Sequence, residues 1–476
     1  MQISISMLSG VTVTREEGQV IIEALPRMRR PRLVFKQVTP TVASILERIQ
    51  KEYAPLNVLT SEVMKNDGMM GIMKWNHYLQ KLGQDALVSY SMSVNDKPFI
   101  SFEPLTTHAT FDHNKVKKDE FYTVSKFAYC HKEPSGMVIN SPLAYSRVCI
   151  QNPTALAAFY ELQDALTMHQ LMERVPELDE AAAITFMNFL ANSGIIVKTE
   201  EGNKSPESKD PVLGQWAFHD LLFQTSNRMG RHSDPYGGTY PFKDIFKPVP
   251  LVKPHMSENI IPLYKPDLEK LKNDDTTFTA VLEKRQSIRK YGEPMTVEQL
   301  GEFLYRAARI KKMSLDAMVS ARPSPGGGAI HSLEIYPVVN RCEGLEKGLY
   351  HYNPQEHHLE KVETDPYVLQ TLIELSGVTG KLEGETPQVI LVLASRFQRV
   401  QIKYQSVAYS VILKDVGCLY QTMYLVATAM GLAPCALGGG DSDLFAQLSG
   451  NNYYAETSVG EFLLGRAPET LPRWGE

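Results

Sequence analysis

A long apolar segment with functional groups at both ends places the strongest constraint on how this chain can fold. Residues 403–441 read KYQSVAYSVILKDVGCLYQTMYLVATAMGLAPCALGGGD. Apolar residues lie on nearly all sides of a helix drawn over residues 409–430, which predicts the central buried helix of a domain. Lys403 and Tyr404 precede this helix and can both carry protons, whereas Gly438 begins a stretch of bare backbone after it. This arrangement indicates a site for a flat ligand.

Length and charge limit the classes of protein that the sequence allows. A chain of 476 residues is long enough for about three domains that each bury a core. Its 49 basic and 54 acidic residues give a formal charge of −5, which supplies no overall attraction to nucleic acid or to an acidic membrane. We therefore expect neither nucleic acid nor a membrane as a partner.

Targeting signals and cysteines indicate the compartment. The apolar segment breaks at Gly431 and Pro434, short of the about 20 apolar residues that a membrane span needs. The N-terminus lacks the basic-then-apolar order of a secretory signal. The five cysteines are scattered, with no C-x-x-C pair, and indicate neither a disulfide framework nor a zinc site. We expect a soluble, cytoplasmic protein.

The first part of the chain shows the element order of two small winged-helix modules, at 1–110 and 111–205. In the first module, strand-like alternation over residues 10–36 is followed by short helices, the last two at 59–68 and 69–83, and by a hairpin. The second module repeats the order of helix, turn, second helix, glycine and strand. Such modules read DNA or hold partners along a sheet edge.

The basic residues of these modules are few and poorly placed for DNA. The second helix of each module carries few or no lysines and arginines, so nucleic-acid binding is the weakest interpretation. The one basic cluster, PRMRRPR at 26–32, lies between prolines in a strand or turn. Such a cluster is most often a solvated loop, and a dock for an acidic peptide is the best functional alternative.

Residues 206–275 form a predicted linker that lies extended along a surface, because they are polar and rich in proline. Three histidines fall in it (His219, His232 and His255), with no metal-ligand spacing among them. A further pair, His357-His358, is predicted to lie in a hairpin turn without partners at ligand spacing. The sequence therefore predicts no metal site.

An α/β domain is predicted over residues 276–476. Near its start Arg285, Ser287 and Arg289 alternate, which aims all three side chains the same way in an extended segment. Two guanidinium groups and a hydroxyl so arranged suit a phosphate or a polyhydroxyl chain. The alternative is a basic helix end that faces water.

A second glycine-rich loop lies at PSPGGG, where Ser324 and Gly326 follow two stiffening prolines. The loop is not G-x-G-x-x-G, and the chain contains no Walker A sequence, so neither a Rossmann nor a P-loop nucleotide site is supported. Close to the C-terminus, a strand ends in Gly465 and Arg466.

Taken together, these segments resemble the FMN-dependent nitroreductase superfamily. The R-x-S-x-R segment, the late glycine turn and the final Gly-Arg are its recurring parts. The Pro-Ser-Pro-Gly-Gly loop and the Lys-Tyr pair resemble the SagB/McbC-type dehydrogenases of thiazole/oxazole-modified peptide biosynthesis, and most of all the ThcOx-like cyanobactin thiazoline oxidases. The resemblance covers residues 276–476. It implies an α+β fold whose C-terminal FMN domain has an antiparallel-rich sheet flanked by helices, preceded by winged-helix modules similar to peptide-recognition elements.

The resemblance also implies residue roles. Lys403 and Tyr404 would be catalytic, because a lysine can act as a base where burial and neighbouring cations disfavour its charged form. A surface lysine at a helix start is the alternative. The arginines and Ser287 would hold the FMN phosphate, ribityl chain and pyrimidine edge, and the other groups would line the ring. The residues assigned to FMN are Arg285, Ser287, Arg289, Ser324, Gly326, Leu437, Gly438, Gly439 and Arg466.

Two departures from the family pattern stand out. Many relatives have Tyr-Gly where this chain has Tyr404-Gln405, and Gly-His where it has Gly417-Cys418. A histidine role at the second position is therefore lost, and Cys418 is interpreted as buried core filling.

The implied reaction is oxidation of thiazolines or oxazolines in a heterocyclised precursor peptide to aromatic azoles. The resemblance also implies molecular oxygen as electron acceptor and a homodimer as the active form. The competing enzyme is an NAD(P)H-dependent nitro- or flavin reductase. The competing non-enzyme is a winged-helix regulator that senses the redox state of a flavin.

Overall fold

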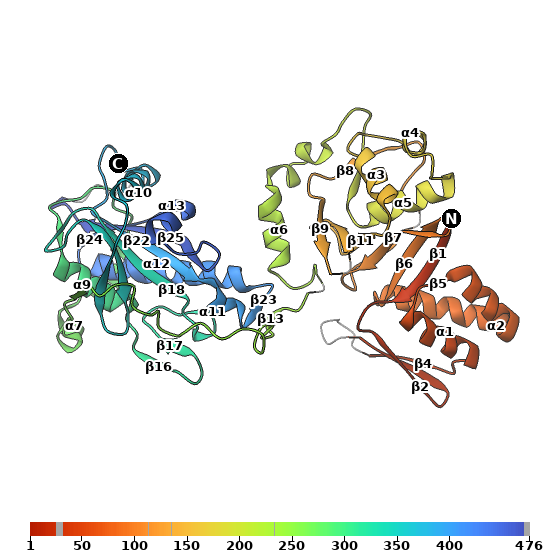
Figure 1. The fold of residues 1–476 in the computed structure, drawn as a ribbon, viewed down its shortest axis with the longest axis horizontal. Helices are drawn as coiled ribbons and strands as arrows, with labels where there is room; N and C mark the ends of the chain where they lie inside the picture. The colour runs from red at the N-terminus through yellow and green to blue at the C-terminus, as the bar shows by residue number, and fades with distance from the viewer. Residues whose placement is uncertain (25–31, 113, 135, 233, 471–476) are drawn as a thin grey trace. The chain divides into compact units, whose positions relative to one another are not determined.

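The computed structural model describes residues 1–24, 32–112, 114–134, 136–232 and 234–470. They form two compact units, Met1–Pro235 and Tyr236–Glu476 (Figure 1). The division falls inside the predicted linker, so the first part of the linker belongs to the N-terminal unit and the rest to the C-terminal unit. The narrower division of the first 205 residues into two modules stays a prediction.

One seven-stranded antiparallel sheet organises the N-terminal unit. In spatial order its strands are β5 (Ala54–Pro55), β1 (Gln2–Met7), β6 (Val88–Val94), β7 (Lys97–Pro104), β11 (Ser146–Ile150), β10 (Gly136–Asn140) and β9 (Tyr129–Glu133). Strand β7 pairs with β11 from Ile100↔Ile150 to Pro104↔Ser146. This pairing joins the segments predicted as separate modules, because strands from both contribute to the same sheet.

The first group of helices follows the sequence closely. Helix α1 (Pro40–Lys51) begins where the Thr39 side chain accepts a hydrogen bond from the Val42 amide. Helix α2 (Leu56–Gln84) is broken at Gly68, whose φ of 66° and ψ of −163° are not helical, so the two predicted helices meet at this residue.

A small sheet accompanies these helices. Its strands β2 (Thr12–Glu16), β3 (Gln19–Glu23) and β4 (Arg32–Lys36) confirm the predicted alternation over residues 10–36. Most of the basic cluster at 26–32 lies outside the described residues.

The second group of helices packs on the other half of the large sheet. It consists of α3 (Pro153–Glu161), α4 (Met168–Arg174) and α5 (Glu180–Asn192), followed by β12 (Ile196–Thr199), which pairs with β8 (Phe121–Val124). Thr167 and Gln170 form a capping box on α4, and Asp179 caps α5. The element order agrees with the sequence, and the winged-helix assignment stays a prediction. Short 3₁₀ helices at Pro206–Lys209 and Leu213–Gln215 and helix α6 (Phe218–Ser226) complete this unit.

A second antiparallel sheet of seven strands is the centre of the C-terminal unit. Its strands, in spatial order, are β14 (Ile260–Pro262), β21 (His358–Val362), β20 (Gly348–Asn353), β18 (Leu333–Val339), β22 (Val389–Arg396), β25 (Glu456–Arg466) and β24 (Leu432–Ala436). Strand β14 comes from the linker, so part of that segment is an edge strand. The remaining short strands are β13 (Gly237–Gly238), β15 (Met295–Thr296), β16 (Lys312–Ser314), β17 (Val319–Ala321), β19 (Cys342–Glu343) and β23 (Tyr404–Gln405).

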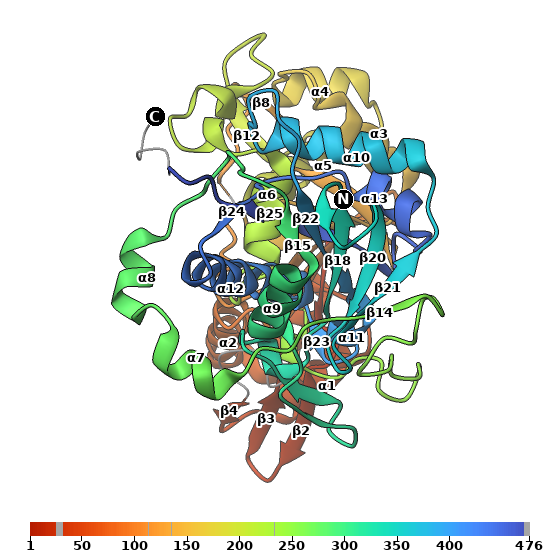
Figure 2. The same ribbon diagram turned by 90° about the vertical axis from the view of Figure 1, so that its left-hand side faces the viewer.

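Helices cover both faces of this sheet (Figure 2). Helices α9 (Val297–Ala308) and α12 (Ala408–Ala429) share a core with Leu391 and Leu393 of β22, whereas α10 (Pro366–Thr379) and α13 (Ser442–Ser449) share a core with Ile390 and Val392. Alternate residues of a strand face opposite sides, so β22 contributes to both cores. The predicted antiparallel sheet flanked by helices is confirmed. The remaining helices of this unit are α7 (Leu268–Asp274), α8 (Phe278–Lys284) and α11 (Phe397–Gln401), and Val400 of α11 belongs to the same core as α9 and α12.

Helix α12 was predicted to be the central buried helix of its domain, but only one face of it is buried. Its buried apolar side chains recur at helical spacing on one face, from Ile412 to Ala427. On the opposite face Leu413 is 38% exposed, and Cys418 is also exposed, so the interpretation of Cys418 as core filling was wrong as well. The sheet covers only one side of the helix. No helix among the described residues is long and apolar enough to cross a membrane.

Candidate active site

Lys403 and Tyr404 lie against the glycine loop of the C-terminal unit. Lys403 follows α11, and Tyr404 begins β23, which pairs with β13. The Lys403 Nζ atom lies 5.3 Å from the centre of the Tyr404 ring. A Cβ atom added at Gly328 would lie 2.5 Å from the Tyr404 hydroxyl and 2.7 Å from Lys403 Nζ. The absence of a side chain at Gly328, where φ is 62°, therefore leaves the space that these two groups occupy.

The loop is attached to α12 by a buried carboxylate. The Gly327 amide donates a 2.9 Å hydrogen bond to Asp415 Oδ1. Burial raises the pKa of Asp415, and the hydrogen bond from Gly327 opposes that rise. Asp415 was not among the residues predicted from the sequence, although a lone acid on the apolar side of a helix is a signal that could have identified it.

A small cavity with a mixed polar and apolar lining lies beside the loop. Its volume of about 20 Å³ suits roughly one water molecule. Burial, together with the charges of Arg322 and Arg399, lowers the pKa of His331 to about 4, so its ring is neutral near pH 7. Ser324 is buried and faces this cavity. The lining residues are Ala308, Arg322, Ser324, Pro325, His331, Leu333, Ile335, Asp415 and Leu419.

The segment with alternating polar residues lies beside the other end of α12. The Ser287 hydroxyl is 2.7 Å from the hydroxyl of Tyr424, which also accepts a 2.8 Å hydrogen bond from the amide of Ala436 in β24. The Arg285 guanidinium lies 5.4 Å from the centre of the Tyr424 ring. Tyr424 thus links this segment to β24. Sequence reasoning missed it because its apolar surroundings hide its hydroxyl.

The third polar residue of this segment binds the end of α10, close to Leu437. Arg289 donates a 2.9 Å hydrogen bond from Nε to the carbonyl of Gly380 at the end of α10. The Leu437 side chain is next to the same residue, since a Cβ added at Gly380 would lie 3.4 Å from Leu437 Cδ2. Gly438 and Gly439 are exposed, and a Cβ added at either would have no neighbour within 4 Å. Their backbone is open to a ligand.

Arg466 is placed differently from the other arginines. Its carbonyl accepts a 3.0 Å hydrogen bond from the amide of Gly292, three residues beyond Arg289, and its side chain is exposed.

The predicted site residues therefore form two groups along α12. Lys403, Tyr404 and the glycine loop lie near Asp415, whereas Arg285 and its neighbours lie near Tyr424. At 1.5 Å of rise per residue, Asp415 and Tyr424 are separated by about 14 Å along the helix axis. A ligand that touched both groups would be elongated.

One histidine was placed wrongly from the sequence. His358 is the first residue of β21 rather than part of a turn, and it does have partners, since its Nε2 atom lies 3.1 Å from Glu360 Oε1. The partners were hidden because the third member of the group, His255, comes from the distant linker.

Comparison with known protein families agrees with this architecture. The nitroreductase family matches residues 282–460, and the family described as cyanobactin oxidase ThcOx matches residues 122–233. The second match lies in the N-terminal unit, outside the residues that carried the resemblance in the sequence. A protein of Methanocaldococcus jannaschii named as nitroreductase MJ1384 is 29% identical over 174 residues, which are 36% of this chain and 81% of that protein.

Two further relatives are named as processing proteins. The trifolitoxin-processing protein TfxB of Rhizobium leguminosarum bv. trifolii is 33% identical over 110 residues, which are 23% of this chain and 30% of that protein. The microcin B17-processing protein McbC of Escherichia coli is 34% identical over 116 residues, 23% of this chain and 42% of that protein. The match thus spans less than half the length of these two relatives.

Among solved structures, a protein of Ralstonia eutropha described as a nitroreductase is 20% identical, with 50% of this chain and 100% of that chain covered and a TM-score of 0.36. A chain of the E. coli microcin synthetase McbBCD complex with truncated pro-MccB17 bound is 19% identical, with 53% and 92% covered and a TM-score of 0.33.

The C-terminal unit is a nitroreductase-like domain, which places the chain among oxidoreductase-type proteins. More particularly, the chain is related to the ThcOx-type cyanobactin oxidases and to peptide-processing proteins of the McbC kind, as the sequence predicted.

Proposed function

We propose that the protein is an FMN-dependent oxidase that converts thiazolines in a ribosomally made precursor peptide to thiazoles. The observation that carries the proposal is the meeting of Lys403 Nζ and the Tyr404 hydroxyl at Gly328. Two proton-carrying groups beside an open glycine loop suit a reaction in which a carbon-bound proton leaves from a ring.

The residues of the second group fit FMN. Among the described residues, neither Arg285 nor Arg466 forms an ion pair with a carboxylate, so both remain able to bind a phosphate. Ser287 and Arg289 would bind the ribityl chain and the pyrimidine edge. The exposed backbone of Gly438 and its neighbours leaves room for a flat ring. When bound, FMN supplies a hydride acceptor.

The chain's own residues would handle the proton. Lys403 would take the proton from the ring carbon that was the cysteine Cα, while the hydride leaves from the neighbouring CH₂. Tyr404 would orient the ring and relay the proton to solvent. The substrate therefore loses two hydrogen atoms, and molecular oxygen, as the final acceptor of two electrons and two protons, leaves as hydrogen peroxide.

The other parts of the proposal follow the same relatives. The N-terminal unit, in which we also propose winged-helix modules, would hold the precursor peptide, since part of it matches the cyanobactin oxidase family. The active form would be a homodimer in the cytoplasm, where the five free cysteines would stay reduced. Oxazolines in the precursor peptide would be oxidised to oxazoles by the same reaction.

The direct test is incubation of the purified full chain with a thiazoline-containing peptide in air, followed by mass spectrometry. We expect a loss of two hydrogen atoms per ring. Lys403→Ala and Tyr404→Phe should keep the yellow colour of bound flavin and lose azole formation. Lys414→Ala, which removes an exposed lysine of α12, is the matched control and should stay active. Undiminished turnover by the Lys403 variant would exclude it as the base.

Flavin binding is tested separately. Arg285→Ala should release FMN, whereas Lys290→Ala, which removes an exposed cation of the same segment, should retain it. A fully flavinated Arg285 variant would contradict the assigned phosphate contact.

A reductase is the second candidate, because the MJ1384 match covers most of a protein named as a nitroreductase. Rapid bleaching of the flavin by NADPH, with no peptide oxidised in air, would favour it. Specific duplex binding with a steep salt dependence would instead favour a flavin-sensing regulator.

A further inference from the structure

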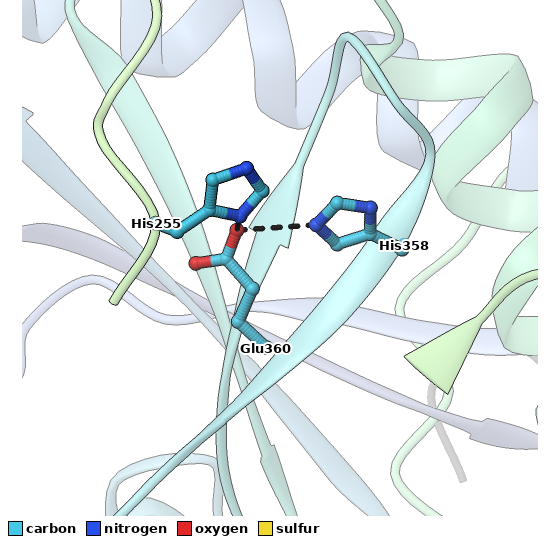
Figure 3. A group of neighbouring side chains, drawn as sticks. All are labelled: His255, His358 and Glu360. Carbon is cyan, nitrogen blue, oxygen red and sulfur yellow. Dashed lines mark hydrogen bonds and ion pairs between the residues drawn. The ribbon is translucent and has the colours of Figure 1, made fainter. Parts of the chain in front are cut away.

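Two histidines and a glutamate from distant parts of the C-terminal unit meet beside the edge of its sheet (Figure 3). His255 lies in the linker before β14, and His358 and Glu360 lie on β21. We propose that His255, His358 and Glu360 bind a zinc ion that fastens the linker to the edge of the sheet. This site is separate from the proposed oxidation chemistry, and nothing in that chemistry requires it.

The distances suit a small cation with imidazole and carboxylate ligands. Glu360 Oε1 lies 2.8 Å from His255 Nδ1 and 3.1 Å from His358 Nε2, and the three atoms all lie within 4.8 Å of one another. With bonds of about 2.0 Å in a tetrahedron, ligand atoms of zinc lie about 3.3 Å apart. The two nitrogen–oxygen distances would lengthen by a few tenths of an ångström, and the two ring nitrogens, which lie within 4.8 Å of each other, would move to the same separation.

The two rings are already oriented for a shared ligand. They are stacked with an interplanar angle of 14° and a separation of 5.4 Å between their centres. Both direct a nitrogen toward the same carboxylate oxygen, as Figure 3 shows. Zinc takes neutral imidazole, so each ring would offer this nitrogen without a proton and keep its proton on the remote nitrogen.

Outer groups support the ligands in the way that metal sites require. Glu356 faces both remote ring nitrogens, at 3.8 Å from His255 Nε2 and 3.5 Å from His358 Nδ1. The second oxygen of Glu360 accepts hydrogen bonds from the Met256 amide at 2.9 Å and lies 3.1 Å from His351 Nδ1. Histidine ligands of metals commonly donate their remote N–H to a carboxylate, and carboxylate ligands are themselves hydrogen-bonded.

The burial of the three side chains shows from which side a fourth zinc ligand could enter. The Glu360 side chain is fully buried and that of His358 is 6% exposed, so two ligands are held rigidly, whereas that of His255 is 45% exposed. A fourth ligand would be water from the side of His255. Imidazole and carboxylate ligands with an open position are a donor set that zinc accepts.

The structural effect would be to secure an edge strand. Strand β14 pairs with β21 over three residues only, from Ile260↔Glu360 to Pro262↔His358. A zinc ion between His255 and β21 would add a cross-link on the N-terminal side of this short ladder.

The test uses the full chain, treated with a chelator and then titrated with zinc sulfate by calorimetry. We expect one ion per chain and a rise in melting temperature on binding. His255→Ala removes the exposed ligand with little risk to folding, and should weaken zinc binding at least about 100-fold. His219→Ala is the control, because this side chain is 82% exposed and lies in the other unit, and it should bind zinc like the wild type.

A second variant addresses the outer carboxylate. Glu356→Gln should weaken zinc binding by about 10–100-fold, the usual effect of losing such a partner. The proposal is overturned if the wild type binds no zinc, or if the His255 and His219 variants bind it equally well. Neither reading depends on azole formation, so failure here leaves the proposed oxidase untouched.

Discussion

Gly328→Ala tests whether the groups that meet at the glycine loop act in the reaction. The new methyl carbon would lie 2.5 Å from the Tyr404 hydroxyl and 2.7 Å from Lys403 Nζ, closer than atoms in contact can approach. The Tyr404 hydroxyl and Lys403 Nζ lie at the ends of flexible side chains. These side chains would therefore move aside, and the backbone would not be deformed. A displacement of about 1 Å at reacting groups can cost about 100-fold in rate. We therefore expect azole formation to slow by about 100-fold.

The same substitution also carries a backbone cost that must be separated from this effect. Gly328 has a φ of 62°, and a residue with a Cβ in this region loses about 1–2 kcal/mol. Gly431→Ala is a matched control, because Gly431 has a φ of 65° and a Cβ there would meet nothing within 4 Å. Both variants should melt about 2–8 °C lower than the wild type.

The assay compares azole formation, flavin content and melting temperature in the two variants. Both variants should keep most of their flavin, because the proposed phosphate contact of Arg285 lies near Tyr424. A partial loss in the Gly328 variant would reflect Ser324 and Gly326, which share its loop and would line the flavin ring. Only the Gly328 variant should lose turnover. If both variants lose stability equally and both oxidise the peptide at the wild-type rate, the contact with Lys403 and Tyr404 plays no part in catalysis.

Two further predictions concern the polar groups beside α12. His331 has a folded-state pKa of about 4, below its unfolded value of 6.5. Between these pH values the unfolded chain binds more protons than the folded one. The protein therefore loses about 3 kcal/mol of stability as the pH falls from 6.5 to 4. Denaturant unfolding at several pH values should show a shallower pH dependence for His331→Asn, and equal slopes would contradict this assignment. Tyr424→Phe leaves the Ala436 amide without its acceptor and frees Ser287, so it should cost about 1–3 kcal/mol of stability and weaken FMN retention. Tyr454→Phe, at an 82% exposed tyrosine, is the control and should change neither quantity.

The local elements of this protein could be read from its sequence because local chemistry specifies them. Thr39 and Asp179 mark helix starts with side chains that satisfy backbone amides three residues on. The turn at Asn95-Asp96 separates two strands where the alternation predicted them, since both residues have positive φ. Each of these features depends on neighbours within a few positions.

The candidate site was partly readable for the same reason. Short motifs identified Lys403, the glycine loop and the Arg285 segment, because functional residue types cluster along the chain there. Asp415 and Tyr424, which hold these segments in place, escaped notice. Their roles depend on partners far away in the chain, and no fixed spacing in the sequence predicts hydrogen bonds of this kind.

The sequence by itself determined where helices and strands begin, which segments carry polar groups and which family the chain resembles. Only the tertiary structure decided that β7 and β11 join the first 205 residues in one sheet, that Cys418 faces outward and that His255 reaches His358. The physical reason is that periodicity gives each element an apolar side, but not the partner that covers it. That partner is chosen by packing between segments that lie far apart in the sequence.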